Sequence, residues 1–126
     1  MKLRYAKASP FVRKVIVFAD EAGLADRMEL VATDVWAENT DIAKDNPLGK
    51  VPALVTKNGT FLGSFACCDY IDRRNGGVRM IPDEPKQRWR VMQMHGLADG
   101  AMEAGVAYIV ESLRRPAEFV YPRYLE

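Results

Sequence analysis

The chain has 126 residues, of which 48% are hydrophobic and 28% charged. This composition is typical of a folded globular domain and does not indicate disorder. The formal net charge is +1, from 18 basic and 17 acidic residues without a basic run. The sequence therefore disfavours nucleic acid and an anionic membrane surface as partners.

The N-terminal segment and the cysteines indicate the compartment in which the protein works. The opening MKLRYAKASP has charges and a proline before any apolar run, and the apolar stretch 15–19 stops at Asp20 and Glu21. It predicts neither a signal peptide nor a membrane span. Cys67 and Cys68 are adjacent, which disfavours a disulfide between them. We expect a cytoplasmic protein.

The first half of the chain alternates between strand and helix patterns. Residues 2–6 are a strand candidate, and apolar residues at helical spacing predict a helix over 11–22 that stops at Gly23. Residues 27–33 read as a second strand. A strand–helix–strand unit of this kind makes its two strands parallel.

A hairpin and a helix follow an irregular stretch. Residues 34–46 are polar and irregular. Strand candidates at 53–56 and 60–62 flank Asn58-Gly59, a strong signal for a β-hairpin. Residues 64–74 then predict a helix. The order β-α-β followed by β-β-α predicts an α/β fold of the thioredoxin-like kind, with a small four-stranded mixed sheet.

The last third of the chain predicts one long helix. Residues 78–85 contain two prolines and read as a linker, and a helical pattern runs from 86 to about 113. At ~1.5 Å per residue this helix would be about 40 Å long, too long for the small sheet. We therefore predict a thioredoxin-like domain at 1–77 and, at 86–126, the first helix and tail of a truncated all-α domain. Its apolar stripe needs a packing partner, and we expect the chain to be part of a longer two-domain protein.

Ser9-Pro10 is the first candidate site. Serine before proline is typical of a helix start, because the serine oxygen accepts an orphan amide hydrogen and proline suits the first helical position. Taken alone, Ser9 predicts an N-cap. The same helix start also favours an anion and lowers the pKa of a thiolate placed there. A serine hydroxyl could donate to that sulfur without reacting.

The second candidate site is Val51-Pro52, inside NPLGKVPALV. Most such bonds are trans, and only ~5% are cis in folded proteins. A cis bond would turn the N–H and C=O of Val51 away from the sheet, where they could pair with an extended peptide. Taken together, the two stretches predict a thiol-containing peptide as the ligand.

Three stretches resemble landmarks of the cytosolic glutathione transferases. They are SPFVRKV at 9–15, NPLGKVPALV at 46–55 and GSFACCDYID at 63–72. In addition, LADGAMEAGV at 97–106 resembles the first helix of the family's C-terminal domain. The chain is similar to the bacterial serine-type members, and the resemblance covers the front of the family's length.

The resemblance implies a glutathione site with named residues. Ser9 matches the residue that hydrogen-bonds the glutathione sulfur. Val51 matches the residue whose main chain pairs with the cysteinyl moiety, followed by Pro52 in the cis form. Lys50 holds a position near the cysteinyl-glycine end, where its charge suits the glycine carboxylate.

Three further positions follow from the same resemblance. Ser64 matches the serine that binds the γ-glutamyl carboxylate at a helix start, which agrees with anion binding at such a terminus. Glu103 falls where some members reach across a dimer to the γ-glutamyl amine. Gly63 replaces the usual aspartate or glutamate, which removes a carboxylate that would face the ammonium group of glutathione.

Other eye-catching residues predict structure and not chemistry. Cys67 and Cys68 read as small buried hydrophobes. The chain has no Cys-x-x-Cys, and Ser9 stands where a disulfide oxidoreductase needs its cysteine. His95 is the only histidine, which disfavours both a metal site and a catalytic triad. Tyr5 and Tyr108 could donate to a ligand, but their spacing singles out neither.

These predictions combine into one function and leave two alternatives. The sequence predicts a homodimeric glutathione transferase with a role in detoxification, which conjugates reduced glutathione, its co-substrate, to small electrophiles and needs no metal. The first alternative is a non-catalytic binding or regulatory module on the same fold, favoured by Gly63 and by the missing helices. The second is a glutathione-dependent isomerase or dehalogenase.

Overall fold

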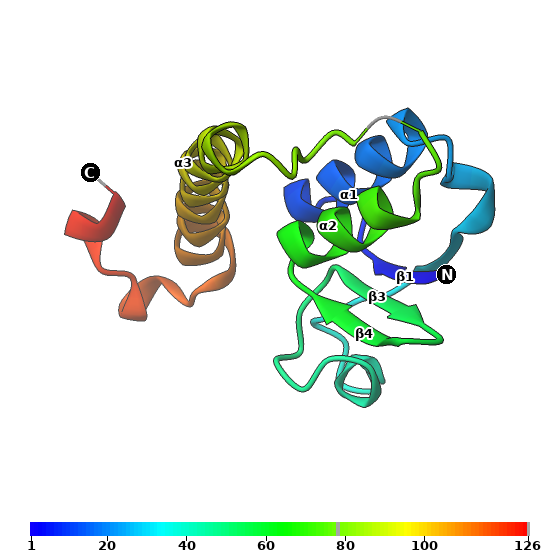
Figure 1. Cartoon of the computed structure of the whole chain (residues 1–126). Helices are drawn as coiled ribbons and strands as arrows, with labels where there is room; N and C mark the ends of the chain where they lie inside the picture. Colours follow the sequence, from blue (N-terminus) through cyan, green and yellow to red (C-terminus); the bar gives the residue numbers. More distant parts are fainter. Residues whose placement is uncertain (78, 126) are drawn as a thin grey trace. The chain divides into compact units, whose positions relative to one another are not determined.

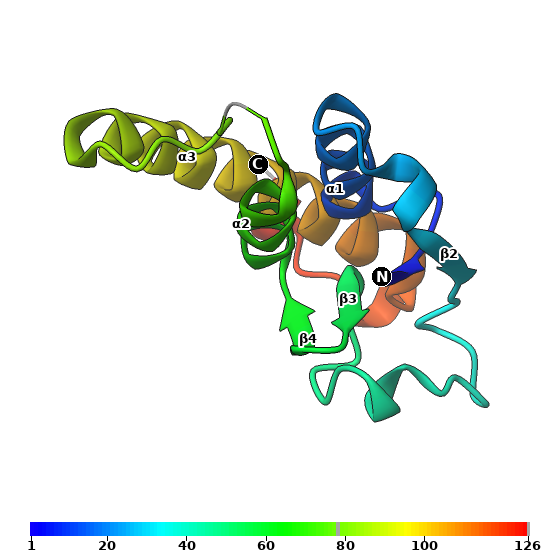
Figure 2. The same cartoon turned by 45° about the vertical axis from the view of Figure 1, so that its right-hand side comes forward.

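Four strands form one mixed sheet, as predicted. The computed structural model describes residues 1–77 and 79–125. The strands are β1 (Lys2–Tyr5), β2 (Glu29–Ala32), β3 (Ala53–Thr56) and β4 (Gly59–Leu62). Their order in the sheet is β2-β1-β3-β4. β1 pairs in parallel with β2 and antiparallel with β3, and β3 pairs antiparallel with β4 (Figures 1 and 2). This confirms the thioredoxin-like arrangement.

Two helices cover one face of the sheet. α1 (Pro10–Glu21) and α2 (Ser64–Arg74) lie side by side over it (Figure 1). Both helices turn their apolar stripe towards the strands, as amphipathic helices on a sheet do. The largest side chains that are fully buried between these layers include Leu3, Val12, Val15, Leu54 and Ile71.

The connections follow the turn signals in the sequence. Gly23 has φ +66°, a left-handed conformation that glycine tolerates after a helix. It is followed by η1 (Ala25–Arg27), a single 3₁₀ turn. A second such turn, η2 (Ile42–Lys44), interrupts the irregular stretch and lies on the opposite side of the sheet from the two helices (Figures 1 and 2). The hairpin turns at Gly59, which has φ +109°.

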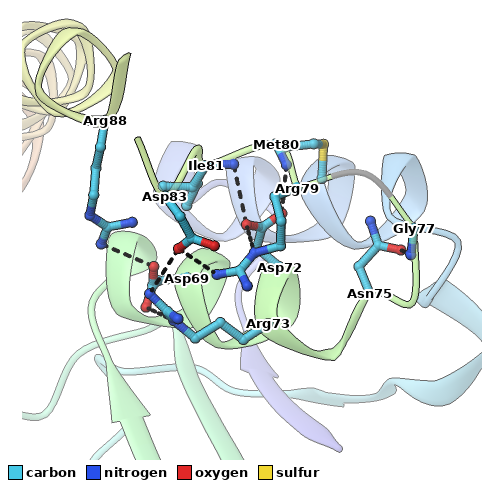
Figure 3. Close-up of polar contacts among 10 residues, drawn as sticks. All are labelled: Asp69, Asp72, Arg73, Asn75, Gly77, Arg79, Met80, Ile81, Asp83 and Arg88. Carbon is cyan, nitrogen blue, oxygen red and sulfur yellow. Dashed lines mark hydrogen bonds and ion pairs between the residues drawn. The ribbon is translucent and has the colours of Figure 1, made fainter. Parts of the chain in front are cut away.

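The segment after α2 is fastened to that helix by a buried carboxylate (Figure 3). Asp72 is 0% exposed and accepts hydrogen bonds from the N–H of Met80 at 2.8 Å and of Ile81 at 3.2 Å. The Arg79 guanidinium pairs with the same carboxylate at 3.1 Å. A buried charge needs such partners. Residues 79–81 are therefore held against α2.

A second carboxylate of α2 binds two arginines (Figure 3). Asp69 pairs with Arg73 at 3.1 Å and with Arg88 at 3.2 Å. Burial raises the pKa of Asp69, but the hydrogen bonds from both arginines outweigh this and leave it below its ordinary value. The start of the long helix is thus tied to α2.

The long helix α3 (Pro85–Ile109) ends in one π-helical turn, η3 (Val110–Arg114). Two 3₁₀ turns follow, η4 (Ala117–Phe119) and η5 (Pro122–Leu125). The chain divides into one unit at Met1–Arg88 and a second at Trp89–Glu126. Our boundaries at 77 and 85 stay a prediction, and residues 78 and 126 of the predicted linker and tail lie outside the described residues.

Many large apolar side chains of the second unit are exposed. None of the described residues of α3 is buried. Trp89 is 60% exposed, Leu97 71% and Leu113 77%. Among the described residues, no helix combines the length and apolar character needed to cross a bilayer.

Candidate functional site

Three chain segments meet at one end of the sheet. The pairing of Arg4 with Ala53 places the end of β1 beside the start of β3, and the pairing of Ala53 with Leu62 places the end of β4 beside both. Ser9 follows the end of β1, Val51-Pro52 precedes the start of β3, and Ser64 follows the end of β4. The register of the sheet thus brings three stretches that are far apart in sequence to the same end of the sheet.

Ser9 caps α1 with its side chain. It adopts an extended conformation, and its Oγ accepts the N–H of Val12 at 3.3 Å. Pro10 occupies the first helical position. No hydrogen bond among the described residues uses the Ser9 hydroxyl as a donor. Since a hydroxyl has one proton to donate besides its lone pairs, Ser9 can cap the helix and donate to a ligand at the same time.

A depression opens beside Ser9. It is lined by Lys7, Ala8, Ser9, Pro10 and Arg13. We call it the Ser9 depression. It lies at the N-terminal end of α1, where free N–H groups and the helix dipole favour an anion. Two cationic side chains add to this positive potential.

The Val51-Pro52 bond is cis, and Pro52 is buried. Val51 is half-buried. Within the described part of the chain, neither its N–H nor its C=O has a hydrogen-bond partner. Main-chain groups in this state can pair with an extended peptide that lies alongside.

Asn46, a residue that sequence reasoning missed, shapes the loop before Val51. It is 2% exposed. Its Nδ2 donates to the Lys50 carbonyl at 2.7 Å, and its Oδ1 accepts the Leu48 N–H at 2.9 Å. The side chain thereby closes a loop in which Gly49 has φ +64°. The Asn-Pro pair at 46–47 was the available signal, because asparagine often hydrogen-bonds the backbone of its own turn.

Arg4, a second residue missed from sequence, ties this loop to β1. The arginine is 7% exposed. It forms an ion pair with Asp41 and another with Asp45 at 3.5 Å, one on each side of η2. The hydrogen bond from Arg4 lowers the pKa of Asp41. Strand β1 thus helps to hold the segment that leads to Val51.

Ser64 begins α2 at the same end of the sheet. It is the first helical residue and is 4% exposed. Gly63 precedes it with φ +79° and ψ 147°, a conformation that residues with a Cβ rarely adopt. A glycine at position 63 therefore suits the backbone conformation found there.

The two remaining candidate side chains, those of Lys50 and Glu103, are exposed. Lys50 presents its side chain to solvent, and Glu103 is exposed on α3 in the second unit. His95 pairs with Asp99 at 2.9 Å. No group of three or more metal-ligating side chains occurs among the described residues.

The cysteines are buried, as predicted. Cys67 and Cys68 are free thiols that are 0% and 4% exposed. The Cys67 thiol donates to the Phe61 carbonyl at 3.4 Å. Burial and the neighbouring Cys68 raise the pKa of Cys67 to about 12. Since the thiolate is the nucleophile, this residue is not built to react.

The chain matches a family model along more than half of its length. Residues 8–74 match the model for "Glutathione S-transferase, N-terminal domain". These residues contain both helices of the first unit and every candidate site residue except Glu103. The chain belongs to the glutathione transferase family.

Relatives agree with this assignment. The chain is 36% identical over 119 residues to the "Uncharacterized GST-like protein YibF" of Escherichia coli K12, covering 94% of this chain and 58% of YibF. It is 36% identical to a glutathione transferase family member from Pseudomonas fluorescens Pf-5 with bound glutathione, with a TM-score of 0.91, covering 98% of this chain and 62% of that one. It therefore spans about three fifths of these relatives.

A further structure from Pseudomonas fluorescens Pf-5 carries a modified ligand. This glutathione transferase family member has bound S-(propanoic acid)-glutathione. The TM-score is 0.84 at 36% identity, covering 99% of this chain and 61% of that one.

Proposed function

We propose that this chain binds reduced glutathione as a co-substrate and conjugates it to small electrophiles. The observation that carries the proposal is the meeting of Ser9, Val51 and Ser64 at one end of the sheet, through the register of β1, β3 and β4. Each offers a different group to the tripeptide. A family relative with bound glutathione supports extending the ligand to this chain.

The sulfur of glutathione is placed beside Ser9. The Ser9 hydroxyl donates to the thiolate, while its Oγ continues to cap α1 through Val12. Hydrogen bonds to a charged group contribute about 1.5–3 kcal/mol, and the helix start adds its positive potential. Ser9 itself does not form a bond to carbon. It lowers the pKa of the bound thiol.

The peptide part of glutathione lies along Val51. Its cysteinyl N–H and C=O pair with the free C=O and N–H of Val51, as an added strand does. The Asn46 bond to the Lys50 carbonyl holds this segment in place. Lys50 then offers its ammonium group to the glycine carboxylate.

The γ-glutamyl carboxylate is assigned to the start of α2. There Ser64 and the first N–H groups of the helix form an anion site. Gly63 provides no carboxylate for the γ-glutamyl ammonium group. We propose that Glu103 of a second subunit serves that group in a homodimer.

The reaction is a displacement at an electrophilic carbon. The thiol proton leaves to solvent, the thiolate sulfur forms a bond to the carbon, and the leaving group departs with its electron pair. The protein contributes by positioning the reactants and stabilising the charge on sulfur. We propose detoxification in the cytoplasm as the setting. The modified glutathione bound by the Pf-5 family member supports room for a substituent on sulfur.

The test combines binding and turnover. Calorimetry with reduced glutathione should give saturable binding, and a chromogenic aryl halide should be conjugated at a rate that falls about 10- to 100-fold in Ser9→Ala. The exposed Lys57→Gln variant on the hairpin turn serves as a matched control and should keep full activity. Unchanged turnover in Ser9→Ala would refute the role given to the serine.

A non-catalytic module is the second candidate, favoured by Gly63. A family site without the carboxylate at this position binds the ammonium group less tightly. Retention of the chain on immobilised glutathione without turnover of any aryl halide would favour the module. Absence of retention would exclude the transferase and leave only a module whose glutathione site is vestigial.

A further inference from the structure

Two depressions on the first unit share the same two cations. The Ser9 depression, defined above, contains Lys7 and Arg13. The second, which we call the Tyr5 depression, has a volume of about 380 Å³ and is lined by Tyr5, Ala6, Lys7, Val12, Arg13 and Ile16. This volume lies at the lower end of the range for small-molecule sites, about 300–1,000 Å³. Lys7 and Arg13 stand at the border of the two depressions.

The shared cations have no ion-pair partner among residues 1–77 and 79–125. Neither Lys7 nor Arg13 forms an ion pair with any residue that the structure describes, whereas Arg4, Arg73, Arg79 and Arg88 all do. The residues that line the two depressions include no aspartate or glutamate. Since the whole chain carries a net charge of only +1, the positive charge here is a local feature. It favours an anion.

The walls of the Tyr5 depression are largely apolar. Val12 and Ile16 contribute aliphatic groups from α1, and Tyr5 contributes a ring from the end of β1. Sites that combine such walls with a few polar groups bind small organic molecules, with the polar groups fixing their orientation. A short carbon skeleton with one carboxylate matches this lining. The carboxylate belongs beside Lys7 and Arg13.

We propose that the second substrate of this chain is a small electrophile that carries a carboxylate, held by Lys7 and Arg13 with its carbon skeleton in the Tyr5 depression. The inference rests on the proposed function and names the substrate class of the same site. The reacting carbon then lies towards Ser9, because the two depressions adjoin. With a haloacid, the glutathione sulfur bonds to the halogen-bearing carbon, halide leaves with the bonding pair, and the carboxylate is unchanged.

The two cations are not needed for the carboxylates of glutathione itself. Those are assigned to Lys50 and to the start of α2 at Ser64, which come from other segments of the chain. Arginine and lysine suit a carboxylate differently, since the arginine fork binds it bidentately and the lysine acts as a point charge.

The test uses two product analogues that differ only in charge. S-(2-carboxyethyl)glutathione carries the carboxylate, and S-(2-carbamoylethyl)glutathione replaces it by a neutral amide of nearly equal size. Calorimetry on the whole chain should give about tenfold tighter binding of the carboxylate form, which corresponds to ~1.4 kcal/mol. The double variant Lys7→Gln/Arg13→Gln should reduce this ratio to about one.

Controls separate this inference from the proposed function. Lys57→Gln removes an exposed cation from the hairpin turn and should keep the tenfold ratio, and thermal melting checks that every variant folds. If reduced glutathione binds but the chain binds the two analogues equally well, the inference alone is overturned. It is also overturned if the double variant still prefers the carboxylate analogue. Failure of reduced glutathione to bind would overturn the proposed function, and the inference with it.

Discussion

Replacing Ser9 by alanine and, separately, by aspartate should separate its two roles, capping α1 and stabilising a thiolate. The capping bond from the Val12 N–H is 3.3 Å long, at the weak end for a hydrogen bond. Its loss in Ser9→Ala should cost about 0.5–1 kcal/mol. For a unit the size of Met1–Arg88, that lowers Tm by about 2–8 °C.

Ser9→Asp keeps the cap and removes the donor. Aspartate caps helices as well as serine does, so Tm should stay close to that of the unchanged chain. An ionised carboxylate cannot donate to sulfur and repels a neighbouring thiolate. Loss of a hydrogen bond to a charged group costs about 1.5–3 kcal/mol. In Ser9→Ala this loss should shift the equilibrium of the bound thiol and thiolate towards the thiol by about 10- to 100-fold. In Ser9→Asp the repulsion between carboxylate and thiolate should make the shift larger.

The assay follows the ultraviolet absorbance of bound thiolate against pH, with thermal melting in parallel. Ser9→Thr keeps a hydroxyl and serves as the matched control, with thiolate formation near that of the unchanged chain. A Ser9→Asp variant that ionises bound glutathione at the same pH as the unchanged chain would refute the hydroxyl's role. Serine would then be a cap alone.

Three further predictions concern side chains of helix α2. Asp72→Ala should lower the free energy of unfolding by about 2–5 kcal/mol, because it leaves the N–H groups of Met80 and Ile81 without their acceptor. Asp83→Ala, at a side chain that is 67% exposed, should cost under about 1 kcal/mol in the same denaturant titration. Cys67 should not react with a disulfide reagent at about pH 8 in the native chain and should react in urea, because its pKa is raised to about 12; fast labelling of the native chain would contradict its burial. The pKa of Asp69 is lowered in the folded chain. Its contribution to the free energy of unfolding is therefore full above its pKa in the unfolded chain, about 3.9, and is lost as pH falls through its lower pKa in the folded chain. Asp69→Asn should therefore flatten the loss of Tm below about pH 4, and an unchanged acid profile would count against the ion pairs.

Local signals predicted α2 and the β3–β4 hairpin well. The predicted helix at 64–74 matches α2, and the Asn58-Gly59 turn placed the β3–β4 hairpin. The helix and the hairpin turn are both specified by residues that are close together in sequence. The predicted strand at 27–33 was too long, because only Glu29–Ala32 pairs with β1. Strand ends depend on the partner strand, which a single sequence does not show.

The residues that sequence reasoning missed act over longer distances. Arg4 lies in the strand candidate at 2–6, where its local pattern indicates no special role. It is buried through its pairs with Asp41 and Asp45, which lie 37 and 41 positions away in sequence. Asp72 was not singled out from the sequence, but it is buried and accepts hydrogen bonds from the N–H groups of Met80 and Ile81. Such roles follow from tertiary packing, and no local pattern reports them.

The central claim is that reduced glutathione lies with its sulfur at Ser9 and its main chain along Val51. A crystal structure of the chain with reduced glutathione tests it most directly. We predict a sulfur within hydrogen-bond distance of the Ser9 Oγ and a pair of hydrogen bonds between the cysteinyl residue and the Val51 main chain. Glutathione bound with its sulfur turned away from Ser9, or with no contact to Val51, would contradict the claim.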